Sequence, residues 1–312
     1  MKTIQIIIPV HNESANIPLL AERLHQVAKQ VDNDYRLNYL WINDGSTDDS
    51  LAQIKKLAKQ DSAHGYLDFS RNFGKESATS AGLHQATADA VIMIDADLQH
   101  PPELVPQLIQ EWKQGAEVVI GVRQNNHGAN LLDKLLSSLY YRIINLIGET
   151  NITPHATDFR LLDQKVIQAF NQLPEKDRLT RGLIDWLGFK RAYLEFDAPA
   201  RENGRKQYSR LRLVKLALSS FIAHSLLPLK VTGYLGLLIT LITGTFGLYV
   251  YLAKYVWQTA WGLSITGAAS LALLIIFLVG LILSCLGLIA LYIAQIRIEA
   301  LNRPMYVIRE KK

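Results

Sequence analysis

The C-terminal third of this sequence contains two long stretches without a charged residue. The first covers residues 231–253 and the second covers 42 residues, 255–296, with only Lys254 between them. A helix needs about 20 apolar residues to cross the hydrocarbon core of a bilayer. A buried hairpin in a soluble protein is the alternative, but so long an uncharged run disfavours it. We therefore predict a segment, 229–296, with two transmembrane helices near residues 231–253 and 267–293.

Basic residues flank these stretches and indicate their orientation. Residues 201–215 contain six Lys or Arg against one Glu, and residues 297–312 contain five against two. The positive-inside rule then places both termini in the cytoplasm, with 297–312 as a basic cytoplasmic tail. This excess makes up much of the net charge of +5 and favours an anionic lipid surface over nucleic acid as partner.

Short apolar segments rich in β-branched residues alternate with helix-length segments in the first part of the chain, which we predict to be one α/β domain, 1–228. Strands that are apolar on both faces and separated by helices form a mostly parallel sheet that is covered on both sides. Ligands bind such sheets beyond the carboxyl ends of the strands. The expected strands are 4–10, 37–44, 66–70, 90–95 and 117–122, and the expected helices are 15–30, 48–60, 75–87 and 103–114.

Polar segments follow three of these strands: PVHNES, NDGSTDDS and DADLQHPP. Asp95 and Asp97 are two residues apart, so in an extended segment they point to the same side and repel each other unless a cation binds. With Gln99 they offer the hard oxygen donors that suit Mg²⁺ or Mn²⁺. A solvated turn before a helix is the simpler interpretation, but three polar strand ends at one sheet edge favour a metal site.

The other polar strand ends are typical of a nucleotide pocket. Glu13 and Asp44 follow their strands where carboxylates can bind ribose hydroxyls, although Asp44 could instead belong to a turn and helix cap. Lys75, in the segment RNFGKE, could reach a phosphate or simply start a helix. Neither a glycine-rich dinucleotide motif nor a P-loop is present in the sequence.

Two further segments have apolar residues at helical spacing together with basic residues. They cover residues 130–148 and 210–227, and the second leads directly into the first expected span. This pattern is typical of helices that lie in the membrane interface. Ordinary core helices would show the same periodicity, so both interpretations stay open.

Five motifs occur in a fixed order: IIIPVHNES, INDGSTDDS, SRNFGKE, DADLQHPPE and TDFRLLD. In this order they resemble family 2 glycosyltransferases, most closely the polyprenyl-phosphate branch related to dolichol-phosphate mannose synthase. The resemblance covers essentially the whole chain. It implies a Rossmann-like GT-A fold with a two-helix anchor, a nucleotide-sugar donor, a divalent metal, a polyprenyl phosphate acceptor and a place in the bacterial plasma membrane.

The resemblance also assigns roles to residues. Asp97 and Asp158 are the implied catalytic residues, and the metal ligands are Asp95, Asp97 and Gln99. The segment RENGRKQYS departs from the family pattern, because Lys206 and Gln207 replace the usual Ser-Lys, so the phosphate ligand among Arg205 and Lys206 is left open. The implied nucleotide-sugar ligands are Pro9, Val10, Glu13, Asp44, Lys75, Asp95 and Ala96. The candidate acceptor-phosphate ligands are Arg201, Arg205 and Lys206, and Arg123, at the end of the fifth expected strand, is a further candidate.

The implied activity is an inverting transfer of a sugar, with glucose from UDP-glucose to undecaprenyl phosphate as the best fit and O-antigen modification as one end use. GDP-mannose and UDP-linked amino sugars stay open as donors. A processive polysaccharide synthase would show a Q-x-x-R-W segment and more spans, and the sequence shows neither. A non-catalytic nucleotide-binding membrane scaffold is the alternative of a different class. Gly280 and Ser284 form a small-xxx-small pair, a weak indication of a homo-oligomer.

Overall fold

The computed structural model describes residues 1–31, 34–123, 156–175, 178–197, 238, 245, 267–301 and 303–312. The chain divides into two compact units, one formed by Met1–Gln207 with Asn302–Lys312 and the other by Tyr208–Leu301. The segments 130–148 and 210–227, predicted as interfacial helices, lie outside the described residues. So does the first expected span, apart from Leu238 and Thr245.

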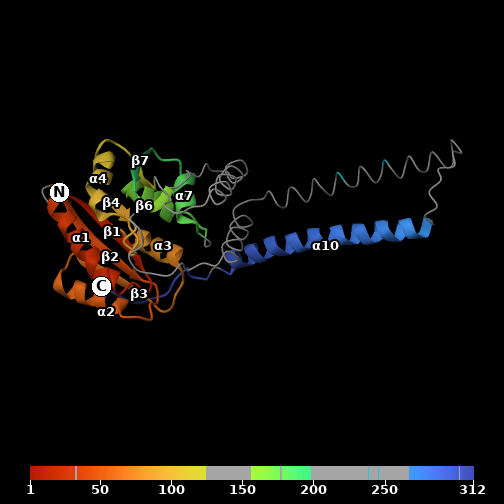
Figure 1. The fold of residues 1–312 in the computed structure, drawn as a ribbon, viewed down its shortest axis with the longest axis horizontal. Helices are drawn as coiled ribbons and strands as arrows, with labels where there is room; N and C mark the ends of the chain where they lie inside the picture. The colour runs from red at the N-terminus through yellow and green to blue at the C-terminus, as the bar shows by residue number, and fades with distance from the viewer. Residues whose placement is uncertain are drawn as a thin grey trace. The chain divides into compact units, whose positions relative to one another are not determined.

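The first unit is built on an eight-stranded sheet with the order β7-β5-β6-β4-β1-β2-β3-β8 (Figure 1). Strand β1 pairs in parallel with β2 and β4, β2 pairs with β3, and β5 pairs with β7. Strands β6 and β8 are antiparallel to their neighbours. The prediction of a mostly parallel α/β sheet is therefore confirmed. The strands are β1 (Lys2–Val10), β2 (Tyr35–Asn43), β3 (His64–Phe69), β4 (Ala90–Met93), β5 (Val118–Arg123), β6 (Ala156–Asp163), β7 (Arg191–Phe196) and β8 (Ile308–Lys311).

Helices cover both faces of the sheet because β1 is apolar on both sides. Ile4, Ile6 and Ile8 belong to a core shared with α1 and α4, whereas Ile7 belongs to a second core shared with α3 and α6. Gly82 lets α3 approach β1 closely, since a Cβ there would lie 2.4 Å from the Ile7 side chain. The helices of this unit are α1 (Asn16–Val31), α2 (Ser50–Gln60), α3 (Lys75–Gln85), α4 (Val105–Lys113, after the 3-10 turn η1, Pro102–Leu104), α6 (Gln164–Asn171) and α7 (Thr180–Trp186).

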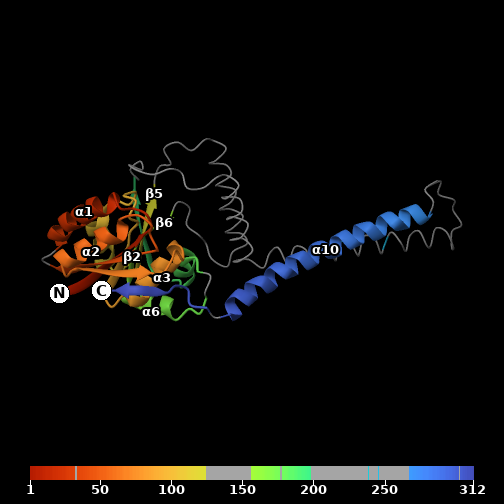
Figure 2. The ribbon, with the colours of Figure 1, turned by 90° about the horizontal axis from the view of Figure 1, so that it is seen from below.

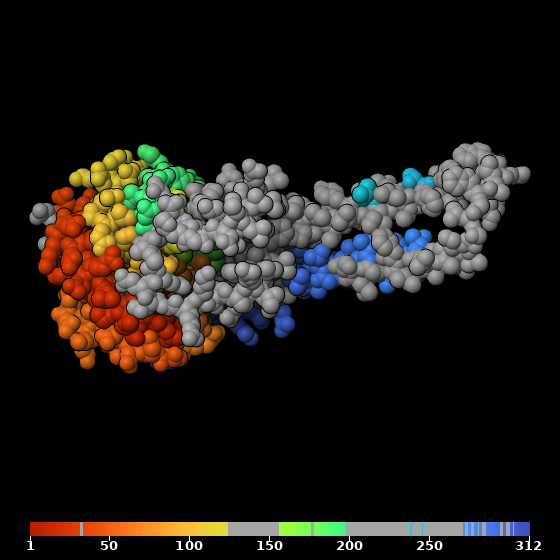
Figure 3. Space-filling view, in the orientation of Figure 1, coloured from red at the N-terminus to blue at the C-terminus, as the bar shows by residue number. Residues whose placement is uncertain are grey.

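The earlier and later elements of the first unit occupy different parts of it. In the space-filling view, residues of β1 to α3 are red and orange, and residues of the later elements α4 to β7 are yellow and green beside them (Figure 3). Strands β1 and β2 belong to the first of these parts, β5 and β6 belong to the second, and β4 connects the two in the sequence. A site that uses the ends of all five strands therefore draws on both parts.

The C-terminal segment corrects the prediction that residues 297–312 are simply a basic tail. Strand β8 pairs antiparallel with β3 at the edge of the sheet (Figure 2). Tyr306 stacks on Phe69 with ring centroids 5.1 Å apart, and Glu310 forms an ion pair with Lys55 at 2.6 Å. The chain end is thus an integral part of the first unit.

In the second unit the structure describes one long helix, α10 (Gly267–Ala300), which contains the second expected span. Large apolar side chains such as Leu271, Ile282 and Ile293 are exposed along it. Within the described ranges, however, no helix meets the combined requirement of length and apolar character for crossing a membrane.

Candidate active site

Asp44, at the carboxyl end of β2, is buried and organises the loop that precedes α3. Its two carboxylate oxygens accept hydrogen bonds from the backbone N–H groups of Phe73 at 2.7 Å and Gly74 at 2.9 Å. The next residue, Gly45, has φ +60°, and a Cβ there would lie 2.3 Å from the backbone of Arg71. The loops after β2 and β3 are therefore in direct contact, and a side chain at position 45 would separate them.

The end of β1 lies against the same loops. The carbonyl of Val10 accepts the N–H of Asp44 at 2.8 Å, and the Val10 side chain is buried in the core. The backbone N–H of Glu13 donates to Ser50 at 2.9 Å, and the Glu13 carboxylate accepts from Asn16 at 2.5 Å. The structure thus places Val10 in direct contact with Asp44, two of the nucleotide ligands predicted from the sequence, while Glu13, a third, contacts Ser50 at the start of α2.

Lys75, the first residue of α3, links the two carboxylates at the centre of the site. Its Nζ lies 2.7 Å from the carboxylate of Asp95, which follows β4, and 2.8 Å from that of Asp158 on β6. Burial opposes the lysine charge, but the two carboxylates outweigh it and raise the pKa of Lys75 above its ordinary value. Lys75 therefore carries a permanent positive charge at this point.

Asp158 is held in its ionised form. Burial alone would raise the pKa of its carboxyl, but the charge and hydrogen bond of Lys75, together with the charges of Arg181 and Arg160, lower it below the ordinary value. A carboxylate with a lowered pKa is a weak proton acceptor. The lowered pKa thus suits Asp158 for positioning a cation such as Lys75 better than for removing a proton.

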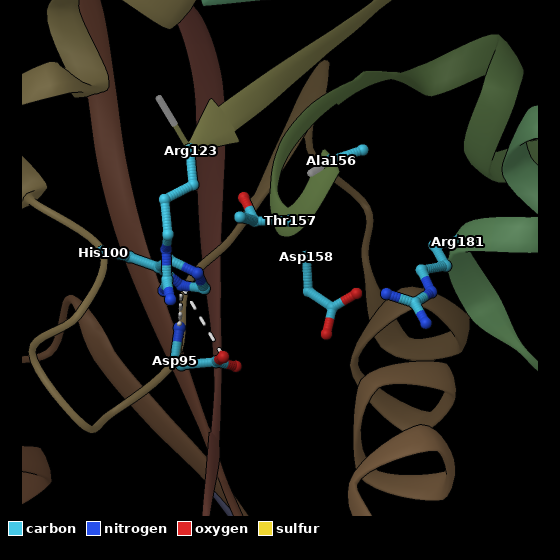
Figure 4. Close-up of a pocket in the computed structure, with 7 residues that line it drawn as sticks. All are labelled: Asp95, His100, Arg123, Ala156, Thr157, Asp158 and Arg181. Atoms are coloured by element: carbon cyan, nitrogen blue, oxygen red, sulfur yellow. Dashed lines mark hydrogen bonds and ion pairs between the residues drawn. The ribbon is translucent and has the colours of Figure 1, made fainter. Parts of the chain in front are cut away.

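These groups surround a pocket of about 260 Å³. Figure 4 shows Asp95, His100 and Arg123 on one side, Asp158 near the centre, and Arg181 on the opposite side. Thr157 is fixed by donating to the carbonyl of Gly121 at 2.8 Å. The pocket is lined by Asp95, His100, Arg123, Ala156, Thr157, Asp158 and Arg181.

His100 supports the turn that carries Asp95. Its ring is buried and stacks on Phe159 with centroids 5.4 Å apart, and its Nδ1 accepts the backbone N–H of Asp95 at 3.2 Å. Burial lowers the pKa of His100, and the charge of Lys75 adds to this effect, although nearby carboxylates oppose it. The hydrogen bond and the burial both favour the neutral ring with its proton on Nε2.

The remaining predicted metal ligands lie on the turn after Asp95. Asp97 accepts the backbone N–H of Gln99 at 3.1 Å, and the Gln99 side chain accepts from Arg123 at 3.4 Å. Ala96, between the two aspartates, is buried. Asp97 is not among the residues that line the pocket. In the part of the chain that the structure describes, no group of three or more His, Cys, Asp or Glu residues is arranged to hold a metal ion.

Three charged residues at the site are not predicted from the sequence. Arg181 lines the pocket, Arg160 forms a buried ion pair with Asp185 at 2.8 Å, and Glu76 accepts the backbone N–H of Thr180 at 2.8 Å. The arginine in the apolar strand segment FRLL was the available signal for a buried ion pair. Arg181 had no local signal, because only tertiary contacts bring α7 to the pocket.

Some predicted site residues cannot be placed in this pocket. Arg201, Arg205 and Lys206 lie outside the described residues. Pro9 lies at the carboxyl end of β1 beside Val10 and is partly exposed. The assignment of these residues to substrate groups therefore stays a prediction.

Comparison with known proteins extends over the whole chain. The sequence is 36% identical to an uncharacterised glycosyltransferase of Synechocystis sp., over 98% of this chain and 95% of the relative. It is 34% identical to the bactoprenol glucosyl transferase of Shigella phage SfV and 32% identical to a prophage bactoprenol glucosyl transferase homolog of Escherichia coli, over 99% of each chain. The profile of glycosyl transferase family 2 matches residues 5–170, which include most of β1, strands β2 to β6 and Asp158. The chain therefore belongs to glycosyltransferase family 2.

Proposed function

We propose that this chain transfers glucose from UDP-glucose to undecaprenyl phosphate, with inversion at the anomeric carbon. The observation that carries this proposal is the full-length similarity to bactoprenol glucosyl transferases, whose names give the sugar and the lipid. The charged pocket supports it, because Lys75, Arg123 and Arg181 surround two carboxylates in a way that suits a phosphate-rich reaction.

The proposed reaction is a single in-line displacement. An oxygen of the lipid phosphate forms a bond to the anomeric carbon of glucose, and the bond from that carbon to the UDP oxygen breaks with its electron pair. A phosphate monoester has a second pKa of about 6, so the nucleophile is already ionised at neutral pH. A strong general base is then unnecessary, which agrees with the lowered pKa of Asp158. In this reaction Asp158 holds Lys75 in place, and Lys75 presents its positive charge to the phosphates.

A divalent cation fits the donor set on the turn after β4. Mg²⁺ is commonly held by one or two carboxylates, with water and substrate phosphates completing its shell. Asp95 and Asp97 supply two such carboxylates, and Gln99 supplies an amide oxygen, so a cluster of three acidic residues is not required. The cation, Mg²⁺ or Mn²⁺, would offset negative charge on the leaving diphosphate. Lys75 supplies a fixed positive charge beside Asp95.

We also propose that the C-terminal segments anchor the enzyme in the bacterial plasma membrane, with the active site on the cytoplasmic face. The uncharged stretches 231–253 and 255–296 support this anchor, and the basic residues around them support the orientation. The exposed Leu and Ile side chains along α10 support it too, because lipid would cover an apolar surface that water disfavours. A lipid acceptor would then reach the enzyme by diffusion within the membrane.

A donor panel tests the proposed function. The full-length chain in nanodiscs would receive undecaprenyl phosphate and one donor at a time: UDP-glucose, UDP-galactose, UDP-N-acetylglucosamine or GDP-mannose. Each reaction would contain Mg²⁺ or Mn²⁺, and a matched reaction would contain EDTA. We expect mass spectrometry to detect a lipid with one hexose, from UDP-glucose and only with metal. Product from GDP-mannose alone would overturn the choice of sugar, and no product from any donor despite UDP binding would favour a non-catalytic scaffold.

A further inference from the structure

Helix α7 is fixed beside the pocket by charged side chains that take no direct part in the proposed reaction. Arg160 and Asp185 form an ion pair at 2.8 Å, and their side chains are 0% and 1% exposed. Arg160 also donates to the backbone carbonyls of Thr157 at 3.0 Å and Arg181 at 3.4 Å. Separating such a pair would leave an uncompensated charge in the interior. The ion pair therefore sets the position of α7 relative to β6.

A second contact fixes the beginning of the same helix. The carboxylate of Glu76, the residue after Lys75 on α3, accepts the backbone N–H of Thr180 at 2.8 Å. Burial raises the pKa of Glu76, and the hydrogen bond from Thr180 opposes this rise. Helix α7 is thus tied to the two elements that carry Lys75 and Asp158, and its residue Arg181 is held across the pocket from Arg123 (Figure 4).

The guanidinium groups of Arg123 and Arg181 have unused donors. The Nε atom of each is buried and has no hydrogen-bond partner among the described residues. A guanidinium stays protonated in proteins, and a buried donor without a partner is destabilising. Phosphate oxygens match the forked donors of arginine and can accept several hydrogen bonds at once. A phosphate in this pocket would therefore use donors for which the described residues provide no partner.

The balance of charge favours an anionic ligand. Among the residues around the pocket, the carboxylates of Asp95 and Asp158 face the cationic side chains of Lys75, Arg123 and Arg181. Lys75 already bridges the two carboxylates. The two arginines on opposite sides of the pocket are the remaining cations.

We propose that Arg181 is a phosphate-binding residue that acts opposite Arg123 in the transfer pocket. This inference rests on the proposed function, which requires two phosphate groups near Asp158: the diphosphate of the donor and the phosphate of the lipid acceptor. Both sources offer the same chemistry to a guanidinium, so the experiment has one arm for each.

The test compares Arg181→Gln and Arg181→Lys with wild type and with Lys190→Gln, which removes an exposed charge from the segment after α7. In one arm KM for undecaprenyl phosphate is measured at saturating UDP-glucose, and in the other KM for UDP-glucose is measured at saturating lipid. Binding of UDP is followed by calorimetry, and the melting temperature reports folding. A hydrogen bond to a charged group is worth about 1.5–3 kcal/mol, so we expect KM for one substrate to rise roughly 10- to 100-fold in Arg181→Gln.

Arg181→Lys keeps the positive charge but loses the forked N–H donors of the guanidinium, so we expect it to recover part of the lost affinity. The control Lys190→Gln should match wild type. An increase in KM for the lipid alone assigns Arg181 to the acceptor, and an increase in KM for UDP-glucose with weaker UDP binding assigns it to the donor. Unchanged KM values for both substrates would overturn the inference, even with a lower kcat. If Arg181→Gln unfolds, Arg181→Lys decides by the same criterion.

The proposed function can fail separately from this inference. A wild-type chain that makes no glycolipid from any donor would contradict the proposed function itself. A wild-type chain that is active, with Arg181 variants that keep both KM values, would contradict only the role of Arg181.

Discussion

Replacing Arg160 with methionine would leave Asp185 as an unpaired carboxylate in the interior. Both side chains are essentially inaccessible to solvent, and the Asp185 carboxylate lies 2.8 Å from the guanidinium. Breaking a buried pair by removing one partner costs about 3–5 kcal/mol. For a domain of this size about 1 kcal/mol changes the melting temperature by about 2–4 °C, so Arg160→Met should lower it by about 6–20 °C.

The double variant Arg160→Met/Asp185→Leu separates stability from activity. It removes both charges of the ion pair, and apolar replacement of a buried ion pair is often neutral for stability. However, the carbonyls of Thr157 and Arg181 would still lose the donor that fixes β6 and α7. We expect most of the melting temperature to return while kcat/KM stays reduced by about tenfold or more, since small misplacements at a reacting centre are costly.

The assay is a thermal melt of the full-length chain in detergent, followed by intrinsic fluorescence, together with the rate of glycolipid formation. A decrease of less than about 2 °C in the melting temperature of Arg160→Met would show that leaving Asp185 unpaired costs little stability, given the 2–4 °C expected per kcal/mol. Wild-type kcat/KM in the double variant would refute its role in positioning the pocket.

Three further predictions concern the pocket and the sheet edge. Asp97→Ala should abolish turnover because a proposed metal ligand is lost, whereas Asp158→Asn should keep residual activity. Equal and complete loss in both variants, measured by glycolipid yield, would argue for Asp158 as an essential base. The lowered pKa of Asp158 means that its stabilising charge is present above the ordinary carboxyl pKa and is lost as the pH falls through the lowered value. Lys75→Met removes the main cause of this lowering, so the acid limb of the kcat/KM profile should move to higher pH. An unmoved limb would contradict the link between Lys75 and Asp158. Tyr306→Ala should lower the melting temperature, because Tyr306 stacks on Phe69 and its hydroxyl forms a hydrogen bond with His84 at 3.1 Å. The control Val307→Ala, at an exposed position, should leave the melting temperature unchanged. Equal melting temperatures for the two variants would show that the edge contact adds no stability.

The sequence predicts the first half of the sheet well because its signals are local. The segments 4–10 and 37–44 are short apolar runs followed by polar turns, and the structure has β1 and β2 there. Asp95 was expected at a strand end that faces a ligand, and it lines the pocket. In these cases the alternation of strands and helices determines both the type of each element and the edge of the sheet at which its last residues lie.

The sequence does not predict features that depend on long-range pairing. Strand β8 is only four residues long and rich in charge, so its pairing with β3, more than 230 positions away, has no local signal. The role of Arg160 depends on Asp185, and the position of Arg181 depends on both Glu76 and Arg160. A sequence pattern can mark a buried arginine as unusual, but its partner becomes known only from the fold.

The anomeric configuration of the product tests the proposed single displacement. Wild-type chain in nanodiscs would convert UDP-glucose, which has an α linkage, and undecaprenyl phosphate in the presence of Mg²⁺ or Mn²⁺, and the purified glycolipid would be analysed by ¹H and ³¹P NMR. A single displacement in this pocket predicts one β-linked glucose joined to the lipid through a phosphodiester. An α-linked product, or the absence of any glucosyl lipid from a chain that binds UDP, would contradict it.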